Sequence, residues 1–218
     1  MSLTEELQKG VALLWEKMVR HPFVVELGDG TLPWEKFKVY FEQDHLFLRA
    51  WTHLLSMGVS KAPTFDDARQ ISGFLDGVLR GEDLLFQDYF REEGLTPDQV
   101  RELEPLPTSL GFNGYLVNVA NQGSFEEIIA ALLCVEWDYN DWAKRLVAAG
   151  KVPQNRYYKT WIDLHAGPEL SDFVSYMRRT LDAAQDPDRA RLERIFRDCL
   201  RYEYMFFEMA YHGEAWPQ

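Results

Sequence analysis

The sequence predicts an all-α protein, built as a single compact helical bundle over residues 1–218. Apolar residues recur at three- and four-residue intervals in almost every segment long enough to judge, which is typical of helices with one buried face. Proline and glycine stand where such helices should begin and end. The chain has no internal repeat and no Gly/Ser linker, and a domain of this length can bury about 70% of its unfolded surface. These observations favour one helical domain that needs neither metal nor disulfide to fold.

The N-terminal half should hold four long helices and one short one. His21-Pro22 should end the first helix, because the residue before a proline avoids the α region, and Gly28-Asp29-Gly30 should form a turn. Thr31 can cap the second helix, with Pro33 in its first turn. Thr96-Pro97-Asp98-Gln99 matches a capping box. The expected bounds are residues 4–20, 31–61, 64–93, a short helix after residue 96, and 109–121.

Gly73, Gly77 and Gly81 interrupt the third helix at a four-residue spacing. Glycines on one helical face would allow a neighbouring helix to approach closely. In the C-terminal half, Ser124 begins a long helix with a second capping-box pattern. Gly167-Pro168 and Asp186-Pro187 mark later boundaries. The expected bounds are residues 124–150, 156–164, 168–184 and 188–211.

The charge balance excludes several kinds of partner. There are 35 acidic and 23 basic residues, giving a net charge of -12 and a pI near 4.9. The negative electrostatic field of such a protein repels phosphate backbones and anionic lipid, so we expect neither nucleic acid nor a membrane as a partner. The two cysteines, Cys134 and Cys199, are too few for a disulfide framework, and no segment resembles a signal peptide or a membrane span. These features favour the cytoplasm.

One carboxylate stands on the apolar face of each of the four longest helices. They are Asp44, Glu82, Glu136 and Glu203. Charged residues are almost never fully buried without a partner or a task. Asp44, for example, shares its face with Phe47 at the three-residue spacing that brings side chains together.

Three interpretations of these acids remain open. Four carboxylates from four helices form the skeleton of a di-iron site, but the imidazole ligands expected three residues later are missing, so we expect no metal. The acids could instead be buried partners of basic or backbone groups, and Glu82 is the strongest candidate for that structural role. In the third interpretation, aromatic residues and the carboxyl groups line one pocket. Such a pocket suits general acid–base chemistry on a neutral heterocycle.

Cysteine and histidine residues also have competing interpretations. Cys134 and Cys199 are better explained as buried packing residues than as nucleophiles. His165 lies just before the break at Gly167-Pro168, where a loop could bring it to the mouth of a pocket. A surface position for His165 is the competing interpretation.

The chain resembles the TenA family, the thiaminase II-like proteins of thiamin salvage. The family has an all-helical, haem-oxygenase-like fold that it shares with PqqC oxidases, and the resemblance spans nearly the whole chain. The motifs that carry it are His21-Pro22-Phe23, Gly28-Asp29-Gly30-Thr31-Leu32-Pro33, Gln43-Asp44, Phe125-Glu126-Glu127-Ile128, Ala131-Leu132-Leu133, Tyr202-Glu203-Tyr204 and Met209-Ala210-Tyr211.

The resemblance implies roles for two of the carboxylates. An aspartate that follows glutamine binds the aminopyrimidine ring in this family, and Asp44 matches it. A glutamate near the C-terminus acts as catalytic acid and base, and Glu203 matches it. The family's nucleophilic cysteine aligns with Val135, and Cys134 is rotated from that position by about 100° on a helix.

This departure implies a second branch of the family, which lacks the cysteine and is rich in glutamate there. Glu136 would then supply the carboxylate. Tyrosines that line the family pocket correspond to Phe47, Phe112 and His165 here, whereas Tyr139 matches a pocket tyrosine. Compared with the family pocket, this chain should therefore keep the aromatic surface that stacks on a ring and lose hydroxyl groups that could bond it.

The expected function is a cytoplasmic hydrolase that releases an amine from an aminopyrimidine, without metal or organic cofactor and without a cysteine nucleophile. Two alternatives remain: a non-catalytic pyrimidine-binding or regulatory homologue, and an oxidase, since one fold hosts several chemistries. The family resemblance further implies a homo-oligomer, a tetramer or a dimer.

Overall fold

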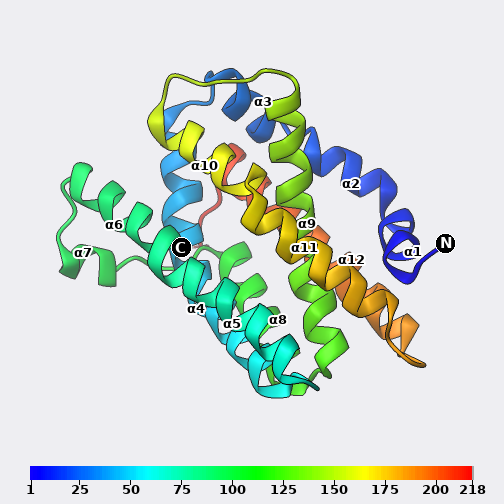
Figure 1. Ribbon diagram of the computed structural model, residues 1–218. Coiled ribbons are helices and arrows are strands. Elements are labelled where there is room, and N and C mark those ends of the chain that lie inside the picture. Colours follow the sequence, from blue (N-terminus) through cyan, green and yellow to red (C-terminus); the bar gives the residue numbers. More distant parts are fainter. Residues whose placement is uncertain (218) are drawn as a thin grey trace.

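The computed structural model describes residues 1–217, and every regular element within them is helical (Figure 1). The predicted all-α class is confirmed. The helices are α1 (Leu3–Gly10), α2 (Ala12–Val19), α3 (Pro22–Asp29), α4 (Trp34–Lys61), α5 (Phe65–Gly77), the π-helical turn η1 (Val78–Glu82), α6 (Asp83–Glu92), α7 (Pro97–Arg101), α8 (Pro107–Gln122), α9 (Phe125–Ala148), α10 (Arg156–Ala166), α11 (Pro168–Asp182) and α12 (Arg189–His212).

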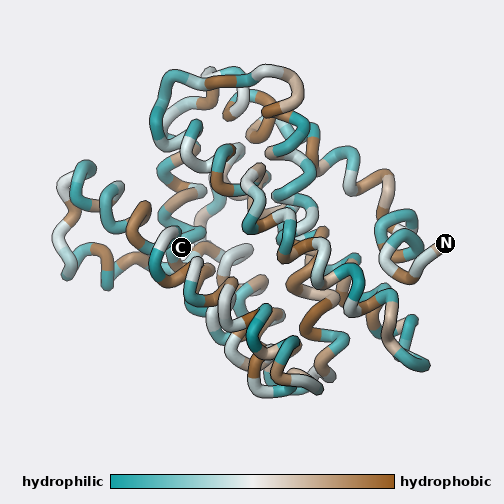
Figure 2. The backbone as a smooth tube through the Cα atoms, viewed as in Figure 1, coloured by the Kyte–Doolittle hydropathy of each residue, from teal (hydrophilic) through white to brown (hydrophobic). Residues whose placement is uncertain are grey.

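Helix α9 occupies the middle of the bundle. It packs against α10, α11 and α12, while α4 packs against α5 and α8 and also meets α9 and α12 (Figure 1). The buried apolar side chains form one cluster that draws on nearly all of the helices. In Figure 2, hydrophobic and hydrophilic stretches alternate along the helices, as expected when one face of each meets the core.

The N-terminal segment departs from the expected single helix followed by a turn. Val11 has φ −120° and ψ 12°, which breaks the helix into α1 and α2. Helix α3 was not expected, and the predicted turn at Gly28-Asp29-Gly30 is wrong, because only Gly30 leaves the helix, at φ 72°. Pro22 occupies the first turn of α3, and the His21 side chain accepts a hydrogen bond from the Phe23 amide at 3.1 Å. The proline that ends one helix therefore begins the next.

The segment predicted as one helix over 64–93 is α5, η1 and α6 in sequence. A Cβ atom added at Gly73, Gly77 or Gly81 would meet no other atom within 4 Å, and all three are exposed. The expectation that they admit a neighbouring helix is therefore wrong. The start of α4 also differs: Pro33 is its N-cap residue, and Thr31 lies outside it.

The remaining helices follow the expected order. Thr96 and Gln99 form the predicted capping box, and Ser124 caps α9 by accepting from the Glu127 amide. Helix α8 begins at Pro107, two residues before the expected start, because a proline is tolerated in a first turn.

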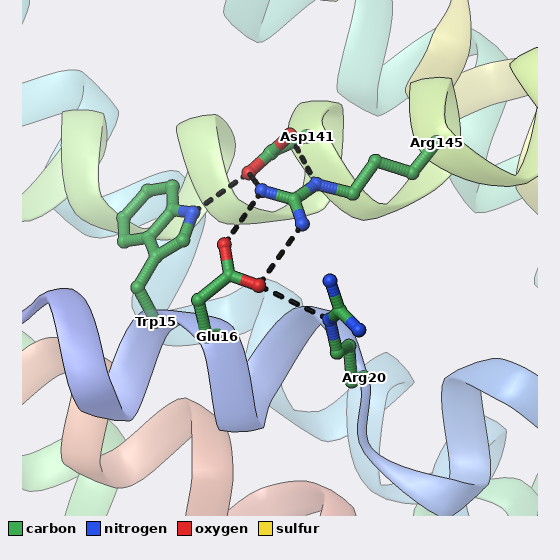
Figure 3. Close-up of polar contacts among 5 residues, drawn as sticks. All are labelled: Trp15, Glu16, Arg20, Asp141 and Arg145. Carbon is green, nitrogen blue, oxygen red and sulfur yellow. Dashed lines mark hydrogen bonds and ion pairs between the residues drawn. The ribbon is translucent and has the colours of Figure 1, made fainter.

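A polar network fixes α2 against α9 (Figure 3). The Trp15 indole donates to Asp141 at 2.7 Å. Arg145 donates to both Asp141 and Glu16, each at 3.0 Å, and Arg20 donates to Glu16 at 3.1 Å. Exposed ion pairs contribute only about 0–1 kcal/mol each, so this network sets orientation more than stability.

Across residues 1–217, the helices that are long enough to cross a bilayer all carry too much polar character to do so.

Candidate active site

A cavity of about 410 Å³ lies between the long helices. This volume falls in the range of small-molecule sites, roughly 300–1,000 Å³. Helices α4, α8, α9, α10 and α12 form its inner walls, and α5, η1 and the start of α11 form its outer wall. The exposed lining residues, which mark the mouth, are Gly73, Gly77, Gly81, Leu164 and Glu169.

The four carboxylates singled out from the sequence all line this cavity. Asp44 comes from α4, Glu82 from η1, Glu136 from α9 and Glu203 from α12. Asp44 and Glu136 are each 7% exposed, and Glu203 is 3% exposed. In the described part of the chain, none of the four forms a hydrogen bond or ion pair with another protein group. The cavity thus presents carboxyl groups that the protein itself leaves free to bind a ligand.

Burial makes these carboxyl groups hold protons unusually well. It raises the pKa of Glu203 to about 8 and that of Glu82 to about 7. The pKa values of Asp44 and Glu136 lie well above their ordinary values, first because of burial and then because of neighbouring carboxylates, Glu82 foremost. At neutral pH the cavity can therefore donate protons as well as accept them.

No basic side chain offsets this charge. The cavity lining within residues 1–217 contains no lysine or arginine. Nor do any three His, Cys, Asp or Glu side chains in that part of the chain come close enough together to hold a metal ion. The carboxylates therefore surround the cavity rather than converge on one point.

Aromatic rings supply most of the remaining inner wall. Phe47 packs against Trp51 and Phe112, with ring centroids 5.6 Å and 5.1 Å away. Phe206 contributes a further ring from α12, next to Phe47 at 6.2 Å. Such rings can enclose a flat heterocycle between apolar faces.

Tyr139 presents its ring to the cavity while its hydroxyl group is held within the protein. That hydroxyl lies 2.7 Å from the Tyr40 hydroxyl, which also accepts from the Trp161 indole at 3.1 Å. The hydrogen-bonded chain fixes the ring orientation, so Tyr139 contributes a wall rather than a mobile donor.

His165 lies in the last turn of α10 and is 7% exposed. The surface position considered for it is therefore wrong. Its Nδ1 lies 2.7 Å from the Trp161 carbonyl, to which it donates. Burial lowers the pKa of His165 to about 4, so the ring is neutral and its Nε2 is an acceptor at the cavity wall.

Cys134 lies outside the cavity and is fully buried. Its thiol donates to the Phe196 carbonyl at 3.0 Å, and burial raises its pKa well above the ordinary value. A protonated, enclosed thiol is a poor nucleophile. Val135, one residue later, is the residue that faces the cavity.

Gln43 positions the site without lining it. Its side-chain amide donates to the Glu104 carbonyl at 3.1 Å and accepts from the Leu106 amide at 2.8 Å. These bonds fix the segment that leads into α8, and α8 carries Phe112.

Sequence reasoning missed part of the outer wall. Glu82, singled out by the same apolar-stripe signal as Asp44 but favoured for a structural role, lines the cavity. The glycines of α5 and η1 also belong to the wall, and their open faces could not be recognised before the helix was placed. Glu169, at the mouth, gave no sequence signal.

Comparisons with known proteins agree with this architecture. Residues 8–213 match the model of the TENA/THI-4/PQQC family. A protein of Halalkalibacterium halodurans named aminopyrimidine aminohydrolase is 30% identical over 99% of this chain and 98% of its own length. A Helicobacter pylori protein of the same name is 28% identical over 98% of this chain and all of its own. The solved structure of a TenA homologue from P. horikoshii OT3 superposes with a TM-score of 0.89 at 28% identity, covering 98% of this chain and 100% of that one.

The helical order, the acid-lined cavity and these matches lead to one assignment: the chain belongs to the TENA/THI-4/PQQC family.

Proposed function

We propose that this chain hydrolyses an aminopyrimidine in thiamin salvage, releasing an amine and leaving a hydroxyl group on the pyrimidine substituent. The observation that carries this proposal is the set of buried, unpartnered carboxyl groups in an aromatic cavity. The relatives named aminopyrimidine aminohydrolase support the substrate class.

In this proposal Asp44 recognises the ring. An aminopyrimidine offers an amino donor beside a ring nitrogen, and a carboxyl group can pair with both. Phe47, Phe112 and Tyr139 enclose the ring faces, and His165 offers its neutral Nε2 as an acceptor at the edge.

Glu203 and Glu136 move the protons. Water attacks the carbon that carries the amine and passes a proton to Glu136, while the carbon–nitrogen bond breaks and Glu203 protonates the departing nitrogen. Glu203 is suited to the acid role because burial raises its pKa to about 8. No thiol takes part, in agreement with the enclosed position of Cys134.

The test is turnover of a panel holding thiamin, aminomethyl-aminopyrimidine and its N-formyl derivative, with the hydroxymethyl pyrimidine followed by chromatography. Glu203→Gln should lower the rate about 10²–10⁴-fold, the usual contribution of a positioned general acid. Asp44→Asn should lower it by weakening ring binding. Glu193→Gln is the matched control, since Glu193 is exposed on the same helix as Glu203.

Unchanged turnover in Glu203→Gln would refute the assigned acid. Binding of the ring without turnover of any panel member by the wild-type protein would instead indicate a pyrimidine-binding protein.

A further inference from the structure

Helix α8 is capped by a residue from a distant part of the chain. Its own N-cap residue, Leu106, has no side-chain group that accepts a hydrogen bond, and Pro107 begins the first turn. The first amides of a helix have no partner within the helix, so they need one from elsewhere. One carboxylate oxygen of Glu214 accepts from the Thr108 amide at 2.9 Å, and the other accepts from the Thr108 hydroxyl at 3.0 Å. The negative charge of Glu214 also meets the positive end of the helix.

Glu214 belongs to a strap, residues 213–217, that follows α12 and reaches the start of α8 (Figure 1). Gly213 turns the chain out of α12 with φ 82°. Two residues beyond Glu214, the Trp216 indole donates to the Pro105 carbonyl at 3.1 Å. Trp216 is 48% exposed, so this end of the strap depends on its hydrogen bond more than on burial. The strap therefore ties the end of α12 to the first turn of α8.

Helix α4 holds the same turn from the other side of the sequence. The Gln43 side chain accepts from the Leu106 amide at 2.8 Å, and Gln43 directly precedes Asp44, the proposed ring ligand. Glu214 in turn follows the helix that carries Glu203, the proposed acid. The start of α8 thus joins the helix that carries the ring ligand to the helix that carries the acid.

Phe112 depends on this junction for its place in the cavity. It lies one turn beyond Thr108 on the same face of α8. Its ring stacks on Tyr202 of α12, with centroids 5.1 Å apart and an interplanar angle of 7°, and packs against Phe47 at 5.1 Å. Because the strap sets how α8 lies along the end of α12, it also sets where the Phe112 ring stands in the cavity wall.

We propose that Glu214 is a positioning residue for the pyrimidine ring: by capping α8 from the strap, it fixes Phe112 in the cavity wall. This inference rests on the proposed function, in which Phe112 encloses one face of the ring. Without the cap, the first turn of α8 opens and the wall loosens. Glu203 and Glu136 keep their places, because α9 and α12 pack directly on each other. Ring binding therefore depends on Glu214, whereas the proton transfers do not.

The chain contains a matched control for this contact. Asp182 holds Thr4 in the same way, accepting from its amide at 2.9 Å and from its hydroxyl at 3.2 Å. Thr4 is buried in α1, and no residue of α1 lines the cavity. Asp182→Ala and Glu214→Ala therefore remove equivalent hydrogen bonds, but only Glu214→Ala removes them from a helix of the cavity wall.

The test is steady-state turnover of the aminomethyl pyrimidine by the full chain. Glu214→Ala should raise KM about three- to tenfold and leave kcat within about twofold, since it disturbs ring placement alone. Asp182→Ala should leave both values near wild type. Glu214→Gln should restore KM to within about twofold of wild type, because its amide can still accept from the Thr108 amide and donate to the hydroxyl. If Glu214→Ala fails to fold by circular dichroism, Thr108→Val, which loses only the hydroxyl bond, should show a smaller rise in KM.

An unchanged KM in the folded Glu214 or Thr108 variant, or an equal rise in Asp182→Ala, would overturn the proposal. Hydrogen exchange of the ligand-free protein separates this failure from failure of the proposed function. Amides of residues 108–112 should exchange at least about tenfold faster in Glu214→Ala than in wild type or Asp182→Ala. If wild type turns over no panel compound, the proposed function fails; faster exchange confined to this segment would still uphold Glu214 as the residue that positions α8, and unchanged exchange would refute it.

Discussion

At the scale of single residues, the decisive feature is a set of carboxyl groups whose pKa values are raised by burial. The Glu203 carboxyl has a pKa of about 8, and that of Glu82 is about 7. An ordinary glutamate, with a pKa near 4.3, would be ionised and unable to act as an acid at neutral pH. The apolar surroundings therefore make the proposed proton donor possible.

The value of kcat/KM for the aminomethyl pyrimidine should fall above about pH 8, as Glu203 loses the proton it donates. Rates measured from about pH 6 to about pH 10 in wild type and Glu203→Gln test the assignment. The variant should lose this fall. A rate that continues to climb above pH 8 would make Glu203 a base.

The sequence was most informative about residues on helical stripes. Asp44, Glu136 and Glu203 could be singled out because a lone carboxylate among apolar residues at helical spacing is anomalous. The cavity lining includes all three. His165 and Glu82 were harder, because exposure and the presence of a partner depend on how separate helices pack. Neither property is encoded in the local pattern.

At the scale of elements, the outer wall of the cavity, formed by α5 and η1, has weak helical propensity because it contains glycines, and these glycines leave one face without side chains. Gly77→Ala should stabilise the protein by about 0.5–1 kcal/mol, because Gly77 already has helical dihedral angles and a Cβ there meets nothing. Thermal denaturation should show a small rise in Tm, of about 1–4 °C. A fall in Tm would contradict the open face.

Gly77→Leu should act on binding instead of folding. Its side chain would extend from the wall at the mouth of the cavity and narrow the space open to a substrate. KM for the aminomethyl pyrimidine should rise several-fold in Gly77→Leu and stay near the wild-type value in Gly77→Ala. Equal KM values in the two variants would show that the substrate does not use the space beside Gly77.

Local sequence patterns predict some helix boundaries and miss others. Capping boxes and prolines located the starts of α7, α9 and α11 well, since those signals act within a few residues. The break at Val11 and the helix α3 were missed although Gly10 ends α1 and Gly30 caps α3, because the apolar pattern continues past Gly10 and α3 is only eight residues long. The π-helical turn likewise depends on tertiary packing.

At the scale of the whole molecule, buried acids should make stability depend on pH. Groups with a folded pKa above the unfolded value bind more protons when folded, so their contribution is present at low pH and is lost as pH rises through the folded pKa. Besides the cavity carboxyls, Asp138 is fully buried with both oxygens unpaired, and burial raises its pKa well above the ordinary value. Tm should therefore fall by several degrees between about pH 5 and about pH 9.

Asp138→Asn separates this effect from catalysis. Asp138 does not line the cavity, so the variant should flatten the dependence of Tm on pH while leaving turnover near the wild-type rate. Differential scanning calorimetry across the pH range gives the comparison. An unchanged slope would mean that Asp138 does not carry the extra proton.

The proposed hydrolysis is carried out by carboxyl groups without a thiol nucleophile. The most direct measurement compares aminomethyl pyrimidine turnover by wild type, Cys134→Ser and Glu203→Gln in one assay. We predict a near wild-type rate for Cys134→Ser, because the thiol is enclosed and bound to the Phe196 carbonyl, and a loss of about 10²–10⁴-fold for Glu203→Gln. Loss of turnover in Cys134→Ser with activity retained in Glu203→Gln would contradict the account.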